Sequence, residues 1–142
     1  MWCLPTEAEW ERTARGTDGR LYPFGNTFDQ SRASTAESPI GVTTSIGAYP
    51  TGLLERVRVA HRIWRAKYGN GKVWEWISSL HTAYPYTPTD GRELPDASGE
   101  RVICGGAWTE KSRLAPPALR GTYSPDHVSS AIGVGVLLAA TS

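Results

Sequence analysis

Glycine and proline interrupt this chain so often that no long helix or wide strand can form. The clearest case is the stretch 22–50, where turn-forming residues recur every few positions. Both residues favour turns and weaken the interior of helices and strands. Six tryptophans among 142 residues supply bulky side chains that can fill the space between short elements. These features predict a domain of short helices, small sheets and long ordered loops.

The length and the charge balance restrict the kind of protein this can be. A chain of 142 residues can bury one core but is too short for two substantial domains. Fifteen basic side chains stand against fourteen acidic ones, so no overall field attracts nucleic acid or a membrane surface. No apolar run approaches the ~20 residues that span a bilayer, and no signal peptide is recognisable. We expect a soluble chain, with no membrane span and no nucleic-acid partner, in a compartment that the sequence does not fix.

A short helix is predicted near the beginning of the chain. Thr6 is followed three residues later by Glu9, the pattern of a capping box, in which each side chain satisfies a free amide of the first turn. The helix should run over about 7–15, because Gly16 follows as a natural C-terminal cap.

Three strands are predicted further along, over 73–77, 101–104 and 132–139. The first alternates β-formers, so that Trp74 and Trp76 share one face while Glu75 lies with aliphatic residues on the other. A carboxylate in that position needs a partner. An arginine, backbone amides and a metal ion all remain open for Glu75.

The segment 53–68 differs in charge from the rest of the chain. Its apolar residues recur at helical spacing, which predicts an amphipathic helix. Residues 55–67 carry five basic side chains against one glutamate, a local net charge of +4. Such a segment could dock on nucleic acid or an acidic partner. The interpretation we favour is a helix with solvated arginines or a disordered insertion.

Four blocks of residues, in order along the chain, resemble a known family. They are residues 4–11 (LPTEAEWE), 22–26 (YPFGN), 71–76 (GKVWEW) and 101–108 (RVICGGAW). They are similar to the LPTEAEWE, YPWGN, GNVWEW and RVLRGGSW signatures of the sulfatase-modifying-factor family, which includes the formylglycine-generating enzyme. The resemblance implies an α+β, C-type lectin-like (FGE-sulfatase type) fold. It also implies one domain over 1–142, the C-terminal portion of the family domain, with a basic insertion at about 55–67.

The resemblance predicts that the family's chemistry is absent. The family enzyme oxidises a cysteine of its substrate with copper held by two cysteines. Carried over to this sequence, these positions are Glu110 and Ala115, which cannot supply the soft thiolate ligands that Cu(I) needs. The two cysteines present, Cys3 and Cys104, both stand where the family has arginine, which suggests that they approach each other and leaves a disulfide open.

The family also binds calcium, and the resemblance implies one site here. Its ligands would be backbone oxygens at Gly71 and Val73 and the carboxylate of Glu75, while Tyr68 stands where the family has asparagine. Hard oxygen ligands are what Ca²⁺ requires. Calcium is therefore the one cofactor that the resemblance suggests, no cofactor is certain, and pairing of Glu75 within the protein is an equal alternative.

A second group shares these signatures, namely the variable receptor proteins that retroelements diversify. In that group the stretch after GGSW is the mutable face that contacts the ligand, and it corresponds to 109–131 here. Its mix of polar and aromatic residues suits adaptable contacts with a protein or a small molecule. The binding residues we predict are Trp108, Glu110, Arg113, Tyr123, Asp126 and His127.

Two functions follow as hypotheses. The first is a non-catalytic ligand-binding module, with variable receptor proteins as one subtype. The alternative is a degenerate or metal-dependent oxidase acting on a sulfatase cysteine or a small thiol. The histidines at 61, 81 and 127 lie at no metal-ligand spacing and beside no nucleophile motif, so they favour neither function.

Overall fold

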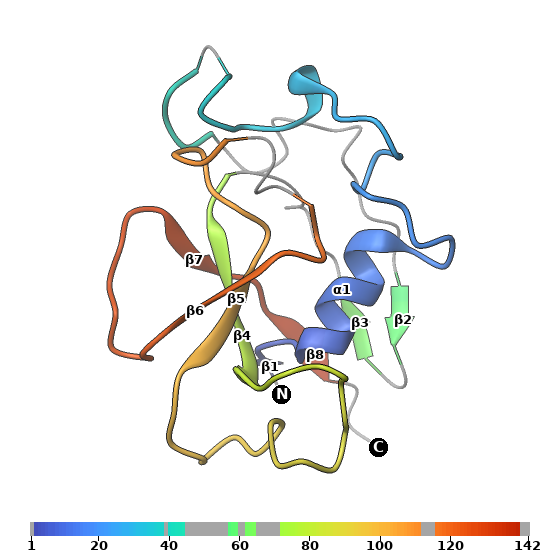
Figure 1. Ribbon diagram of the computed structural model, residues 1–142, viewed down its shortest axis with the longest axis vertical. Coiled ribbons are helices and arrows are strands. Elements are labelled where there is room, and N and C mark those ends of the chain that lie inside the picture. Colours follow the sequence, from blue (N-terminus) through green and yellow to red (C-terminus); the bar gives the residue numbers. More distant parts are fainter. Residues whose placement is uncertain are drawn as a thin grey trace.

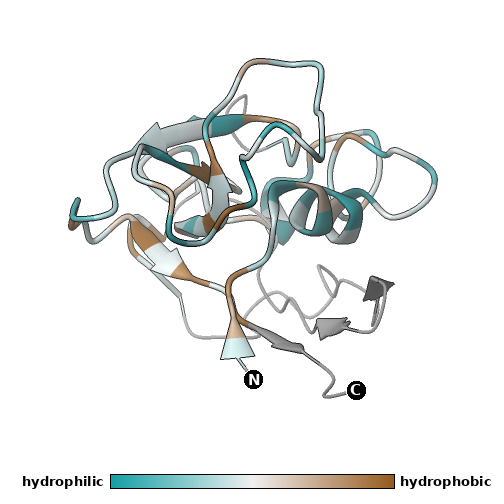
Figure 2. Cartoon of the chain, turned by 90° about the horizontal axis from the view of Figure 1, so that it is seen from below, coloured by the Kyte–Doolittle hydropathy of each residue, from teal (hydrophilic) through white to brown (hydrophobic). Residues whose placement is uncertain are grey.

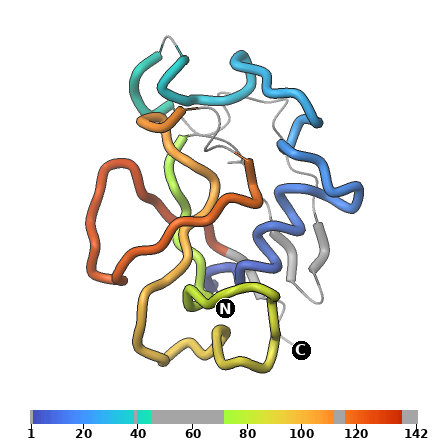
Figure 3. Tube along the Cα trace, viewed as in Figure 1, coloured from blue at the N-terminus to red at the C-terminus, as the bar shows by residue number. Residues whose placement is uncertain are grey.

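The computed structural model describes residues 2–38, 40–44, 72–111 and 116–139, together with the strands 57–59 and 62–64. In chain order the elements are β1 (Trp2–Cys3), α1 (Glu7–Arg15), the 3-10 helix η1 (Gln30–Arg32), β2 (Val57–Val59), β3 (Arg62–Trp64), β4 (Trp74–Leu80), β5 (Arg101–Cys104), β6 (Arg120–Tyr123), β7 (Ile132–Val134) and β8 (Leu137–Ala139). Long loops link these short elements, as Figures 1 and 3 show. Within the described ranges, no helix has the length and apolar character needed to cross a membrane.

The strands form two small sheets. One has the order β1-β8-β3-β2 and the other β6-β5-β4-β7. In the second sheet β4 pairs antiparallel with β5 and parallel with β7, while β5 pairs antiparallel with β6. The combination of one α-helix with mixed sheets is the α+β class that the sequence predicted.

The N-terminal helix forms as its capping box predicted. The Thr6 hydroxyl accepts a hydrogen bond from the Glu9 amide, and the Glu9 carboxylate accepts one from the Thr6 amide. The helix ends at Gly16, whose φ of 65° lies in the left-handed region that favours glycine. Trp10 and Ala14 of this helix are buried in the core, so one helical face anchors α1 to the second sheet.

The helix predicted over 53–68 is wrong where the structure describes that segment. Residues 57–59 and 62–64 are antiparallel strands, with Val57 opposite Trp64, and β3 also pairs with β8. The sequence VRV alternates and is rich in β-branched residues, which suits a strand as well as the helical spacing suits a helix. Pairing with β8, far along the chain, provides the backbone partner that makes the strand the stable choice.

The predicted strand 132–139 also differs from the structure, because it is divided between the two sheets. Ile132–Val134 pairs with β4, whereas Leu137–Ala139 pairs with β1 and β3. The chain therefore passes from one sheet to the other at residues 135–136.

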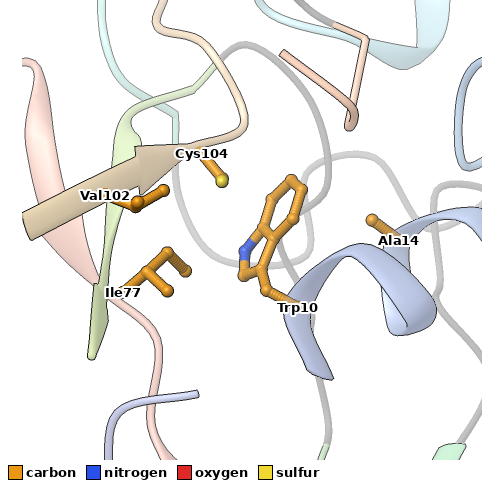
Figure 4. Close-up of a cluster of buried hydrophobic side chains, with 5 residues drawn as sticks. All are labelled: Trp10, Ala14, Ile77, Val102 and Cys104. Atoms are coloured by element: carbon orange, nitrogen blue, oxygen red, sulfur yellow. The ribbon is translucent and has the colours of Figure 1, made fainter. Parts of the chain in front are cut away.

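The core lies between α1 and the second sheet. Figure 4 shows Trp10 pointing from the helix toward Ile77, Val102 and Cys104 of β4 and β5. The β4 strand alternates as predicted, with Glu75, Ile77 and Ser79 buried and the intervening residues partly exposed. Gly105 follows β5 with a φ of 103°, and a Cβ there would lie 3.3 Å from the Trp10 ring, so glycine is needed where the backbone passes the indole.

Candidate functional site

Three of the predicted binding residues lie together at the end of β6. The rings of Tyr123 and His127 are stacked, with centroids 4.1 Å apart and planes 4° from parallel. The His127 amide donates to the Ser124 carbonyl and closes the intervening turn. Asp126 is exposed within this turn, and a hydrogen bond from the Ser124 side chain lowers the pKa of its carboxyl. The turn therefore presents a flat aromatic pair beside a carboxylate.

Trp108 and Glu110 lie at the other end of β5. Arg101 pairs with Tyr123, whereas the turn that holds Trp108 follows Cys104 at the far end of the strand, as Figure 1 shows. The predicted binding residues that the structure describes therefore lie in two separate places, one at each end of β5. Arg113 lies outside the described residues.

The backbone fixes the turn at Trp108 and Glu110 firmly. The Trp108 amide donates to the Lys72 carbonyl at 3.1 Å, and the Glu110 amide donates to Ala107 at 2.9 Å. In return the Glu110 carbonyl accepts from the Ala36 amide at 2.8 Å. The indole nitrogen of Trp108 is buried and has no hydrogen-bond partner among the residues that the structure describes, which is uncommon for a buried donor. A ligand or a water molecule that accepts this hydrogen bond would remove that cost.

Glu75 lies in the core and bonds to a tryptophan. Its Oε2 accepts a hydrogen bond from Nε1 of Trp10 at 2.8 Å, and the residue is 4% exposed. Burial raises the pKa of the Glu75 carboxyl to about 7, although the indole hydrogen bond acts in the opposite direction. The partner of Glu75 is thus an indole N–H. From the sequence we considered an arginine or backbone amides as protein partners, and the structure shows neither for this bond.

The structure describes two of the three residues predicted to bind calcium, Val73 and Glu75. Val73 precedes β4 beside Glu75, but Gly71 lies outside the described residues. Ca²⁺ takes six to eight oxygen ligands and prefers ionised carboxylates, whereas Glu75 near pH 7 is divided between protonated and ionised forms. Among the residues that the structure describes, no group of three His, Cys, Asp or Glu side chains suits a metal. Calcium at Gly71, Val73 and Glu75 stays a prediction.

The two cysteines are free thiols, so the structure contains no disulfide between them. Cys3 is partly buried and packs against the core cluster that contains Cys104. Burial raises the pKa of the Cys104 thiol well above its ordinary value, which keeps this sulfur protonated and poorly reactive.

A buried ionic cluster around Glu7 was not anticipated from the sequence. Its carboxylate lies 3.3 Å from Nη1 of Arg120 and 3.9 Å from Nη1 of Arg92, and it accepts a hydrogen bond from the Tyr84 hydroxyl at 2.7 Å. The Arg92 side chain is fully buried and also pairs with Asp90 at 2.7 Å. The cluster joins the beginning of α1 to β6 and to the loop after β4.

Tyrosine rings complete this cluster. The Arg120 guanidinium lies 4.1 Å from the Tyr84 ring centroid, and that of Arg92 lies 4.6 Å from the Tyr86 ring centroid. Burial, together with the bond to Glu7, raises the pKa of the Tyr84 hydroxyl to about 12. Glu7 and Arg120 are 113 residues apart, so no local spacing could have revealed the pairing.

Comparison with known proteins agrees with this fold. Residues 1–140 match the family model described as "Sulfatase-modifying factor enzyme 1-like domain". The formylglycine-generating enzyme of Streptomyces coelicolor is 31% identical over 153 residues, covering 92% of this chain and 44% of its own length. The inactive Cα-formylglycine-generating enzyme 2 of Bos taurus is 30% identical over 145 residues, covering 92% of this chain and 42% of its own.

A solved structure extends the comparison. Treponema denticola variable protein 1 superposes with a TM-score of 0.70 at 24% identity, covering 96% of this chain and 47% of its own. The fold is therefore of the C-type lectin-like, formylglycine-generating-enzyme type. The chain belongs to the sulfatase-modifying factor enzyme 1-like family, and it spans less than half the length of each of these three relatives.

Proposed function

We propose that this chain is a non-catalytic ligand-binding module, of the kind found in retroelement-diversified variable proteins. The observation that carries the proposal is Glu110. It stands at the first of the two positions where the family's copper-binding cysteines fall, and three backbone hydrogen bonds hold its turn in place. A carboxylate is a hard ligand and cannot replace a thiolate toward Cu(I). Ala115 stands at the second position.

The remaining thiols do not supply the missing ligands. Cys104 is 2% exposed in the core, and its raised pKa disfavours the thiolate that binds metals. Cys3 is the other cysteine of the chain and lies on β1.

Surface chemistry at the end of β6 supports a binding role. Tyr123 is 41% exposed although it stacks on His127, so the outer ring face and edge are free to meet a ligand. Aromatic side chains often dominate the energy of interfaces, and an ionised carboxylate such as Asp126 adds a directional acceptor. The similarity in fold to a variable protein agrees with this assignment.

The test is whether a cysteine peptide from a sulfatase is oxidised. The chain is incubated with Cu(I), oxygen and the peptide, and the product is analysed by mass spectrometry. The Streptomyces coelicolor enzyme, treated in parallel, is the positive control. We expect no aldehyde from this chain. Aldehyde formation that persists after repurification of the chain would replace the proposal with the degenerate oxidase.

A further inference from the structure

A cavity lies between the segment leading from β1 into α1 and the second sheet, and Pro125 of the Tyr123–His127 turn contributes to its lining. Its volume is about 750 Å³, within the range of roughly 300–1,000 Å³ that is typical for sites that bind small molecules. Its lining includes Cys3, Trp76, Pro95, Arg101, Pro125 and Val134. We call it the Trp76 pocket.

The polar groups of the Trp76 pocket are already engaged within the protein. The Arg101 guanidinium donates to four backbone carbonyls, those of residues 78, 94, 95 and 97. The Glu93 carboxylate accepts from the hydroxyls of Ser79 and Tyr86. These contacts engage four of the five guanidinium N–H groups and both carboxylate oxygens within the protein.

The smaller polar side chains are satisfied in the same way. Thr6 belongs to the capping box, where its hydroxyl donates to Glu9. The Ser78 hydroxyl donates to the Pro5 carbonyl. Since the hydroxyl hydrogens of both side chains are already used within the protein, apolar surface provides most of what remains for recognition.

The apolar surface of the Trp76 pocket comes from separate parts of the fold. Trp76 comes from β4, Pro95 from the loop before β5, Pro125 from the loop after β6 and Val134 from β7. Apolar colouring marks both β7 and the chain between β1 and α1 in Figure 2. Val134 is 64% exposed, which places the mouth of the pocket on its side.

We infer that the Trp76 pocket binds an uncharged, flat apolar molecule such as a polycyclic aromatic compound. An indole and two prolines offer the faces on which a flat ring packs, and burial of such a ring is favourable by the hydrophobic effect. Pro125 of the turn lines the pocket, whereas neither ring of the stacked pair, Tyr123 or His127, does. The inference is therefore independent of the proposed function, and each can fail without the other.

The test uses Nile red, an uncharged polycyclic dye whose emission shifts in apolar surroundings. We expect saturable binding to the wild-type chain with one dye per molecule. Val134→Arg places a guanidinium at the mouth and should weaken binding at least tenfold. Val128→Arg is the matched control, because Val128 is 92% exposed and does not line the pocket. Binding that Val134→Arg leaves unchanged would overturn the inference.

A second measurement needs no variant and so does not depend on the folding of Val134→Arg. Cys3 lines the pocket, whereas Cys104 is buried in the core, so N-ethylmaleimide should alkylate Cys3 alone in the folded chain. Saturating Nile red should slow this reaction severalfold, as mass spectrometry of the alkylated peptide would show. Alkylation of Cys3 at the same rate with and without dye would also overturn the inference.

Discussion

The indole Nε1 of Trp10 donates a hydrogen bond of 2.8 Å to Oε2 of Glu75, and this pair joins α1 to β4 inside the core. The pair has a consequence for the pH dependence of stability. The pKa of Glu75 is about 7 in the folded chain, against an ordinary value of 4.5. Between these two values the unfolded chain releases a proton that the folded chain retains. A rise in pH over this window therefore favours unfolding.

We expect the contribution of Glu75 to stability to be complete below pH 4.5, to fall from there to about pH 7, and to change no further above it. The pKa difference corresponds to about 3 kcal/mol. Glu75→Gln keeps an acceptor for Trp10 but has no carboxyl to titrate. The unfolding free energy of the wild type, relative to that of the variant, should therefore fall as the pH rises from 4.5 to about 7. Urea unfolding at a series of pH values measures it. Parallel curves for the two proteins would show that Glu75 does not titrate in this window.

The ionic cluster predicts a large difference between two glutamates of the same helix. Glu7→Ala leaves Arg92 and Arg120 without their shared carboxylate in a buried position, and removing one partner of a buried pair costs about 3–5 kcal/mol. Glu11→Ala is the control, because Glu11 pairs with Arg15 in a partly exposed i,i+4 bridge, and such helix pairs contribute about 0.3–0.5 kcal/mol. Urea denaturation of both variants measures the two losses. Equal losses would mean that the cluster does not stabilise the fold.

Local patterns predicted the elements that depend on neighbours in sequence. The capping box of Thr6 and Glu9 and the strand at 101–104 are confirmed because hydrogen bonding within a turn or β-branched composition suffices to specify them. The segment 57–64 was predicted as a helix because Val57 and Trp64 fit a helical stripe. Its strands depend on β8, more than seventy positions away. No periodicity within the segment contains that information.

The candidate site shows the same limit. Tyr123, Asp126 and His127 were predicted and lie together because a four-residue turn brings them there. Trp108 was assigned to the same face, but the length of β5 separates it from them. The ring partner of Glu75 and the pairing of Glu7 with Arg120 arise only once α1 packs on the second sheet.

The predicted calcium site can be tested through the same carboxyl. Calcium binds the ionised form of Glu75, so its stabilising effect should be greater at pH 8 than at pH 6. Melting temperatures in calcium chloride and in EDTA measure this effect at each pH. Glu75→Gln should abolish it. Equal melting temperatures in calcium and in EDTA at pH 8 would exclude calcium at this site.

The stacked pair of Tyr123 and His127 gives the prediction that bears on the proposed function. A peptide selected from a phage library against the wild-type chain serves as the ligand, and calorimetry measures its affinity. Tyr123→Ala combined with His127→Ala removes both rings of the stack and should weaken binding by about 2–4 kcal/mol, the range for truncation of hot-spot residues. Because the pair lies on an exposed turn, the variant should keep the circular dichroism spectrum of the wild type.

The matched control for this variant is Tyr123→Phe, which keeps the ring and its stacking on His127 but loses the hydroxyl. It should retain binding to within about 1 kcal/mol, since the aromatic face provides most of the contact. If the alanine variant binds as the wild type does, the ligand contacts another surface. The next place to substitute is then the turn at Trp108 and Glu110, at the far end of β5, where the described part of the chain offers the buried indole N–H no acceptor.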